Sequence, residues 1–203
     1  MKHIIGNYSN LLGQLNKETL AHSKNVARIS YECSQALGLN PVESYKIGLL
    51  HDVGKIYIPS RILKKNNRLT GIEREIIDLH SYLSYRLIKD LGESPDIYIP
   101  VLYHHGFDKP KIKFLKPAII VTHKMREHTY LVHSVDVFDA LIQKRIYHDP
   151  FDQEEIFKIL KEDPMCTDDI LEEIKKFSCT EIRGKNNSYI FNNKGEDTCK
   201  KHY

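Results

Sequence analysis

The chain has 203 residues, of which 41% are hydrophobic and 28% charged, so it is long enough for one domain with a sizeable core. Its formal net charge of +3 is too small to indicate binding to nucleic acid or to a membrane surface. No apolar run approaches the roughly 18 residues of a membrane span, the N-terminus is too polar for a signal peptide, and the four cysteines lack C-x-x-C spacing, so we expect a reduced, cytoplasmic protein.

The first part of the chain contains two helix-capping motifs. Asn16 precedes an apolar face at helical spacing, and Gly38 ends that pattern. The dipeptide Asn40-Pro41 supplies a cap and a first-turn proline for a helix that runs to about His51. These residues predict two consecutive helices.

Further helices are predicted downstream, and only two short segments, 118–122 and 188–191, have a β-like composition. The predicted helices are a long one from the Thr70-x-x-Glu73 capping box to Gly92, one from Ser94-Pro95 that carries His104 and His105, one over 131–145, one that begins at a capping box and hydrophobic staple at Phe151-Asp152, and a last one over 168–177. The sequence therefore predicts an all-α fold, with 1–15 as a lead-in, 16–180 as a single helical domain and 181–203 as a loosely ordered polar tail.

The histidines are the most informative residues. His22 continues an apolar helical stripe, and so does His80, which places both rings on the side of the helix that faces the core. A single inward histidine is ordinarily a core residue with a satisfied hydrogen bond. This chain adds a His-Asp pair at a predicted helix end, His51-Asp52, and a His-His pair on another predicted helix, His104-His105. Because burying several imidazoles and carboxylates together is costly, the pattern indicates a site for a cation.

The segment 49–56, LLHDVGKI, resembles the signature of the HD phosphohydrolases, and most of all that of the HD-GYP branch, which hydrolyses cyclic di-GMP. The resemblance spans roughly residues 16 to 177 and continues in chain order through His22, Leu69-Thr70 with Glu73, His80, His104-His105, and 136–141 with Arg145 and Tyr147. It implies a helical bundle around a centre of two or three metal ions.

The resemblance also implies roles for the matching residues. The metal-binding residues shared by HD enzymes correspond to His22, His51, Asp52 and Asp136, and the additional histidines of the branch with two or three metals correspond to His80, His104 and His105. Asp52 would bridge two metals, and Lys55 would reach a substrate phosphate. Glu18 matches a glutamate that binds a third metal in some members, although a carboxylate in the first helical turn also interacts favourably with the helix dipole.

The ligand types then suggest the chemistry. Mixed imidazole and carboxylate ligands suit iron or manganese, with zinc and nickel as alternatives. Two such ions roughly 3.5–4 Å apart lower the pKa of a shared water and clamp the attacking and leaving oxygens. We therefore expect catalytic roles for Asp52 and Lys55. Arg145 matches a position that contacts the substrate phosphate, and its other interpretation is a surface ion pair.

The remaining acidic and histidine residues are given structural interpretations. Asp139 is predicted to fix a helix by hydrogen bonding rather than to bind metal. His123 and His128 match nothing in the family pattern. His133 matches nothing either, but it lies one helical turn before Asp136 and is compatible with a position behind the ligands.

The sequence departs from the family pattern where a ligand would be held. Residues 106–110 replace the expected Gly-Tyr-Pro loop, Asn66-Asn67 replaces a Pro-Gly pair, and His148 stands where a second basic residue is expected. The basic clusters at 61–68 and 109–116 are interpreted as solvated loop faces, with an anionic ligand as the alternative. The residues that match the metal ligands are all retained, so we expect hydrolysis, but the sequence does not identify the substrate.

Three functions remain as hypotheses. The first is a phosphodiesterase that opens a cyclic dinucleotide, and the second is a related HD enzyme that acts on another nucleotide or an alarmone. The third is a non-catalytic HD-fold module that senses a nucleotide or binds a partner. The expected partner is a small nucleotide rather than a membrane or duplex nucleic acid, and the sequence does not indicate an oligomeric state.

Overall fold

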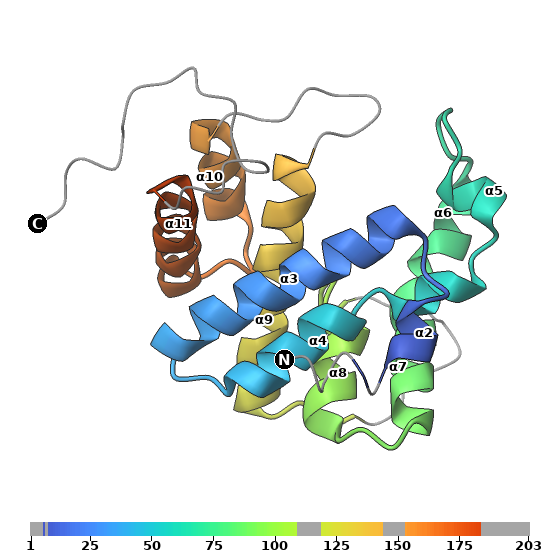
Figure 1. The fold of residues 1–203 in the computed structure, drawn as a ribbon, viewed down its shortest axis with the longest axis horizontal. Coiled ribbons are helices and arrows are strands. Elements are labelled where there is room, and N and C mark those ends of the chain that lie inside the picture. The colour runs from blue at the N-terminus through green and yellow to red at the C-terminus, as the bar shows by residue number, and fades with distance from the viewer. Residues whose placement is uncertain (1–5, 7, 109–118, 144–152, 184–203) are drawn as a thin grey trace, which may run out of the picture.

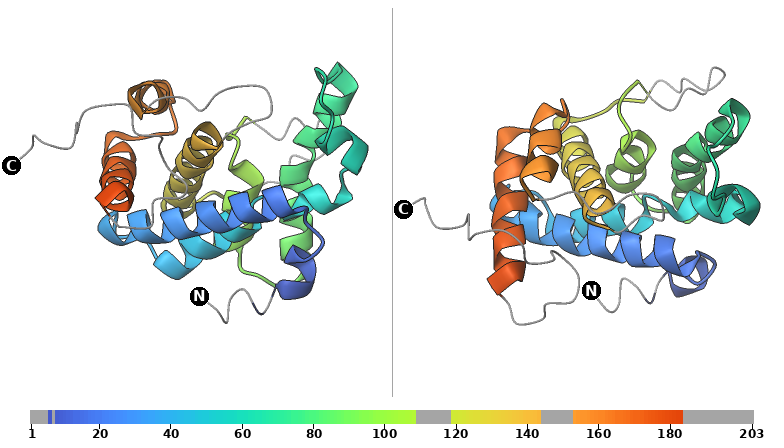
Figure 2. Two further views of the ribbon diagram at one scale, coloured as in Figure 1. Left: turned by 45° about the horizontal axis from the view of Figure 1, so that its top comes forward. Right: turned by 90° about the horizontal axis from the view of Figure 1, so that it is seen from above.

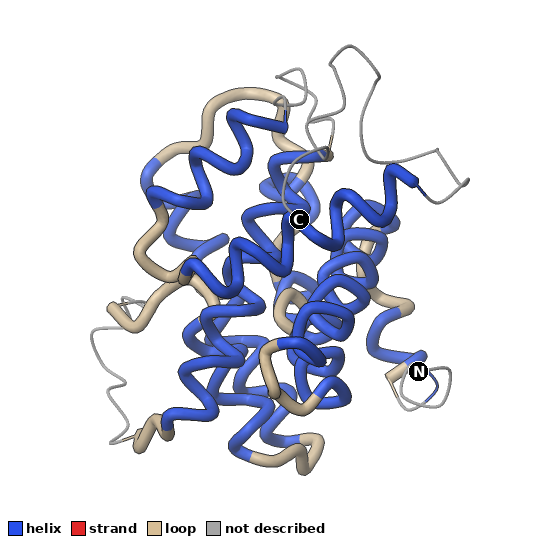
Figure 3. Tube along the Cα trace, turned by 90° about the vertical axis from the view of Figure 1, so that its left-hand side faces the viewer, coloured by secondary structure: helices blue, strands red, loops and turns tan. Residues whose placement is uncertain are grey.

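The structure is a computed structural model that describes residues 6, 8–108, 119–143 and 153–179, and the backbone of 180–183. The described residues form helices joined by loops and contain no strand, which confirms the predicted all-α fold (Figure 3). The helices are α2 (Ser9–Leu12), α3 (Lys17–Ala36), α4 (Pro41–Leu50), the 3₁₀ helix η1 (Val53–Tyr57), α5 (Ser60–Leu63), α6 (Gly71–Asp78), α7 (His80–Asp90), α8 (Pro95–Tyr103), α9 (His123–Ile142), α10 (Gln153–Glu162) and α11 (Asp168–Arg183).

The predicted helix starts at Asn16, Asn40 and Thr70 are confirmed. The side chain of Asn16 accepts a hydrogen bond from the Thr19 backbone N–H, and Asn40 caps α4 in the same way. At α6 both hydrogen bonds of the capping box between Thr70 and Glu73 are present. Side-chain oxygens at these positions satisfy backbone donors that have no partner inside the helix, so the caps fix where the helices begin.

The prediction of one long helix from Thr70 to Gly92 is wrong, because the chain forms two helices separated at Leu79. The His80 ring explains the interruption. Its Nδ1 atom lies 2.6 Å from the carbonyl oxygen of Ile77 and takes up an acceptor near the end of α6. The break between α6 and α7 therefore accompanies the hydrogen bond that holds the His80 ring.

The prediction of a β-like segment over 118–122 is also wrong for its described part. Residues 119–122 form no regular structure, and Thr122 caps α9 by accepting from the Met125 backbone N–H. Helix α9 thus begins well before the predicted residue 131. The other β-like segment (188–191), the cap at 151–152 and most of the polar tail lie outside the described residues.

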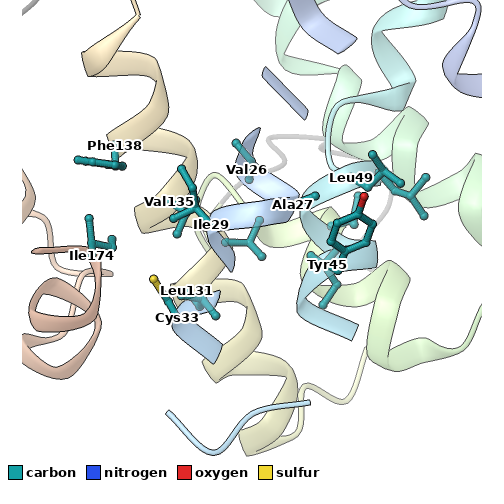
Figure 4. Packing of buried hydrophobic residues seen from close by; sticks show 14 of the residues in the cluster. Val26, Ala27, Ile29, Cys33, Tyr45, Leu49, Leu131, Val135, Phe138 and Ile174 are labelled. Carbon is teal, nitrogen blue, oxygen red and sulfur yellow. The ribbon is translucent and has the colours of Figure 1, made fainter. Parts of the chain in front are cut away.

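Helix α3 spans the molecule from the end occupied by α5 and α6 to the end occupied by α10 and α11 (Figures 1 and 2). It packs against α4, α9 and α11. Buried aliphatic residues from three helices meet along this axis, among them Val26 and Ile29 of α3, Leu49 of α4, and Leu131 and Val135 of α9 (Figure 4). Each contributes roughly 1.5–3 kcal/mol by burial, so these contacts fix the relative positions of the helices.

Glycine at position 48 permits the close approach of α3 and α4. A Cβ atom there would lie 2.8 Å from the Cα of Ala27, closer than real Cβ atoms come to their neighbours. The backbones of the two helices therefore touch. This contact lies three residues before His51, at the end of α4 that leads into the site.

The described part of the N-terminal lead-in packs on the domain rather than extending from it, since Tyr8, Leu12 and Leu15 are buried in the core. Cys33 and Cys166 are free and buried, but Cys179 is disulfide-bonded. That bond differs from the expectation of a fully reduced chain, which was based on spacing alone. None of the described helices is long and apolar enough to cross a membrane.

Candidate metal centre

The seven histidines and aspartates predicted as core ligands come together from five segments of the chain. His22 lies on α3 and Asp136 on α9, while the others lie at or next to ends of α4, α7 and α8. Their potential ligand atoms form three groups, each with all atoms within 4.8 Å of one another: His22, His51 and Asp136; His51, Asp52 and His104; and His80, His104 and His105. Since neighbouring groups share His51 or His104, they form one continuous cluster.

Three of these rings are held by the carbonyl oxygen three residues earlier in the chain. The Nδ1 atom of His51 donates to Gly48 at 2.7 Å, that of His80 to Ile77 at 2.6 Å, and that of His104 to Val101 at 2.6 Å. A carbonyl oxygen can only accept, so each Nδ1 carries a proton, and in the neutral ring each Nε2 keeps a lone pair. The ends of α4, α6 and α8 thereby select the tautomer that a metal ligand needs.

The Nε2 lone pairs point at one another. The Nε2 atom of His80 lies 3.4 Å from that of His104 and 3.0 Å from that of His105. In the Nδ1–H tautomer of His80 and His104, no proton lies between their two nitrogens. Such an arrangement is repulsive unless a cation lies between them.

The Nε2 atom of His51 is in a similar position. It is buried, has no hydrogen-bond partner among the described residues, and lies 3.5 Å from Oδ2 of Asp52 and 3.7 Å from Oδ1 of Asp136. An acceptor nitrogen that faces two carboxylate oxygens in a buried position is unfavourable, because no hydrogen bond can form between acceptors. A divalent ion would convert this repulsion into coordination.

His22 lies between two carboxylates of α9. Its Nε2 is 2.8 Å from Oδ1 of Asp136, and its Nδ1 is 2.6 Å from Oδ2 of Asp139. Burial disfavours the charged ring, but the two carboxylates outweigh it and raise the pKa of His22 to about 10. Although burial opposes it, the hydrogen bond from His22 and the nearby His51 hold the pKa of Asp136 well below its usual range.

Asp52 is buried at the centre of the cluster, and its two oxygens face different groups. Its Oδ2 lies 2.5 Å from Nζ of Lys55, and its Oδ1 lies 3.3 Å from Nε2 of His80. Burial alone would raise the pKa of Asp52, but Lys55 and the surrounding histidines hold it well below the usual range. Asp52 is therefore a carboxylate able to contact two cations.

The rings of His80, His104 and His105 are neutral and can bind a metal ion through a nitrogen lone pair. Burial is the main cause that lowers the pKa of His80 and of His104, and it lowers the pKa of His105 to about 4. These three rings carry no charge at neutral pH. The cluster combines several neutral imidazoles with two carboxylates in a buried space, and this donor set fits divalent transition-metal ions.

Glu18, the predicted ligand of a third metal, is not part of this cluster of described residues. Glu18 is exposed in the first turn of α3 and belongs to none of the three ligand groups of the described residues. Arg145 lies outside the described residues. Their predicted roles stay predictions.

Two residues lie behind the ligands: Asp139, which the sequence did not assign to the site, and His133, whose spacing from Asp136 was compatible with this position. Asp139 was interpreted as fixing a helix, but its carboxylate holds the ring of His22. His133 lies behind His104, with its Nδ1 2.7 Å from the His104 carbonyl oxygen and its Nε2 2.9 Å from Oδ2 of Asp163. Asp139 and His133 both lie on α9 one turn from Asp136, and this spacing is the sequence feature that indicates their position near the site.

The HD domain family model matches residues 19–143, a range that includes every residue of the cluster. The chain belongs to the HD-domain family. This HD domain is 30% identical over 148 residues to a cyclic di-GMP phosphodiesterase of Thermotoga maritima, which covers 70% of this chain and 39% of that protein. It is 30% identical over 164 residues to the 3'3'-cGAMP-specific phosphodiesterase 1 of Vibrio cholerae, which covers 78% of this chain and 37% of that protein.

A shorter match is to ribonuclease Y of Fervidobacterium nodosum, 34% identical over 106 residues, or 49% of this chain and 18% of that protein. Among solved structures, the HD domain of the L. monocytogenes phosphodiesterase PgpH in complex with cyclic-di-AMP has a TM-score of 0.63 at 19% identity. That comparison covers 90% of this chain and 100% of the other, and it shows that the two share a fold. The chain spans less than two-fifths of the length of either cyclic-dinucleotide phosphodiesterase.

Proposed function

We propose that this HD domain is a metal-dependent phosphodiesterase that opens a cyclic dinucleotide, cyclic di-GMP or a relative of it. The observation that carries the proposal is the convergence of buried imidazole nitrogens and two carboxylates, above all at Nε2 of His51, which has no hydrogen-bond donor to satisfy it among the described residues. The cyclic dinucleotide as substrate is supported by the names of the Thermotoga and Vibrio relatives.

In this proposal the seven clustered residues hold two cations. One would be bound by His22, His51, Asp52 and Asp136, and the other by Asp52, His80, His104 and His105. Iron or manganese suits this donor set, with zinc or nickel as alternatives. Glu18 is the proposed ligand of a third ion. When bound, such ions activate water for attack and neutralise charge on a phosphodiester.

The protein's own residues orient the substrate and the ligands. Lys55 is paired with Asp52 and has 24% of its side chain exposed, so its ammonium is the cation that a phosphate meets at the edge of the cluster. Asp139 keeps the proton on Nδ1 of His22 and leaves its Nε2 for the centre. Arg145 is proposed as a second phosphate contact. A cytoplasmic location stays a prediction, and the disulfide at Cys179 is the observation against a fully reduced chain.

Turnover and metal content, measured together on protein purified without oxygen, test the proposal. The wild-type protein should contain bound metal and hydrolyse cyclic di-GMP with manganese or ferrous iron. His51→Ala and Asp52→Ala should abolish turnover while the helical fold is retained. His123→Ala is the matched control, because that ring is 84% exposed on α9 and belongs to none of the ligand groups. Arg145→Ala should mainly raise KM if this residue only holds substrate.

The result that overturns the proposal is unchanged turnover in either His51→Ala or Asp52→Ala. Linear nucleotides, an alarmone and single-stranded RNA belong in the same assay, because the Gly-Tyr-Pro loop is absent and ribonuclease Y is among the relatives. Hydrolysis confined to one of those compounds would replace the cyclic dinucleotide as substrate. A protein without bound metal would favour the non-catalytic module.

A further inference from the structure

A cavity of about 460 Å³ lies beside the proposed metal centre, between the α2–α3 connection and the segment that contains η1 and α5. Its polar lining comes from Gln14, Asn16, Lys55, Tyr57, Ser60 and Lys64. The volume is in the range of small-molecule sites. Lys55 lines the cavity while its Nζ lies 2.5 Å from Oδ2 of Asp52, so the cavity and the metal centre meet at one side chain.

The charge of this cavity suits an anion. Two lysines line it and no carboxylate does. Lys64 forms no ion pair within the described part of the chain, whereas its neighbour Lys65 is paired with Glu73 at 2.5 Å. The basic cluster at 61–68, interpreted from the sequence as a solvated loop face, therefore presents one unpaired ammonium to a cavity.

The rest of the lining suits a planar group with polar edges. Tyr57 is 58% exposed, which is unusual for so large an aromatic side chain, and Leu15 and Ile58 provide buried apolar surface. The side-chain oxygen of Asn16 is engaged by the Thr19 backbone N–H, so the amide nitrogen is the group that Asn16 can offer to a ligand. An aromatic surface next to donors is the arrangement that binds nucleobases by stacking.

We propose that this cavity holds the second, non-reacting nucleotide of the substrate, with Lys64 against its phosphate and Tyr57 stacked on its base. The inference rests on the proposed function, because Lys55 would hold the reacting phosphate where the cavity meets the centre. A phosphodiester with only one phosphate leaves Lys64 without a phosphate to contact. The cavity thus selects dinucleotides over smaller phosphodiesters.

The test compares two substrates with the metal-loaded protein: cyclic di-GMP, and bis(p-nitrophenyl) phosphate, which has no second phosphate. Lys64→Ala and Tyr57→Ala should each raise KM for cyclic di-GMP about tenfold, the size expected for one charged contact or one stacked base. Both variants should leave kcat, and KM for bis(p-nitrophenyl) phosphate, within about twofold of wild type. Tyr57→Phe, which keeps the ring, should restore the wild-type KM. Lys158→Ala removes an exposed lysine of α10 and is the matched control.

Unchanged KM for cyclic di-GMP in both variants overturns the inference and leaves the proposed function standing. An equal rise in KM for the two substrates also overturns it, since the second nucleotide would then not be involved. If the wild-type protein does not hydrolyse cyclic di-GMP, the proposed function is wrong, but the cavity can still be tested. Calorimetry then measures whether the protein binds cyclic di-GMP and its linear dinucleotide. Binding that Lys64→Ala weakens about tenfold supports the cavity, and absence of binding by the wild type overturns it.

Discussion

The carboxylate of Asp139 accepts a hydrogen bond from the ring of His22, with 2.6 Å between Oδ2 and Nδ1. The bond joins α9 to α3 and turns Nε2 of His22 toward Asp136. In metal sites, carboxylates placed behind a histidine fix its tautomer and increase its basicity. Asp139 is therefore a positioning residue for the proposed centre, although it need not touch a cation.

Asp139→Asn should weaken metal binding by roughly 10- to 100-fold, because an amide is a weaker acceptor and can present its N–H₂ group to the ring. Competition with a chelator of known affinity measures the change. Asp169→Asn, an exposed position in the first turn of α11, provides the control. Equal metal affinity in wild type and Asp139→Asn would show that the contact does not orient the ligand.

Metal binding should release about one proton at His22. In the metal-free protein the pKa of His22 is about 10, so the ring is protonated at neutral pH and its Nε2 lone pair is not available. The pKa values of His80, His104 and His105 are lowered, so those rings are already neutral. Affinity should therefore rise as the pH increases from about 7 toward 10. Calorimetry at about pH 8, in two buffers of different ionisation enthalpy, measures how many protons are released on metal binding. Release of no proton would contradict the assignment of His22 as a protonated ring that becomes a metal ligand.

Removal of metal should destabilise the fold. A ligand at about 100 times its Kd stabilises the native state by about 2.7 kcal/mol, which for a chain of this size is a shift in Tm of roughly 5–10 °C. Thermal melts with and without chelator measure it. The Tm of His51→Ala should respond much less to metal, and an equal response in both proteins would place the stabilising ion elsewhere.

Gly54→Ala should damage both stability and the ligand cluster. An added Cβ would overlap the carbonyl oxygen of His80 and lie 2.5 Å from the Ser84 backbone nitrogen, so α7 would have to move. Overpacking of this kind costs roughly 1–3 kcal/mol. Gly71→Ala is the control, since an added Cβ there meets nothing within 4 Å. Chemical denaturation gives the free energy of unfolding, and metal content reports His80; equal values for both variants would contradict the prediction.

The sequence predicted the helix starts well because caps are local. Asn16, Asn40 and Thr70 each bond to a backbone N–H within three residues, so the pattern alone determines the contact. The interruption at Leu79 was missed because it accompanies the bond of the His80 ring to the Ile77 carbonyl. The Nε2 atom of the same ring faces His104, His105 and Asp52, which are distant in the sequence. Local propensity contains no information about that cluster.

The candidate ligands were predictable from their order along the chain, but the residues behind them were not. His22 and Asp139 are 117 positions apart, and their contact depends on how α3 packs against α9. The position of His133 behind the ligands was compatible with the sequence, but its partner Asp163 was not predicted, because the two meet where α9 approaches the connection between α10 and α11. The cavity next to Lys55 likewise arises from two segments that only the fold brings together.

The rings of His51, His80 and His104 each donate a hydrogen bond to the carbonyl group three residues earlier, and this bond fixes the ring relative to its own backbone. Such a ring cannot swing toward a smaller ion or away from a larger one without losing its bond. In the proposed centre, a difference in ionic radius would then be accommodated in part by movement of the helices next to these rings. Exchange of one metal for another would alter the spacing of α4, α7 and α8, and with it the shape of the surface that meets the substrate.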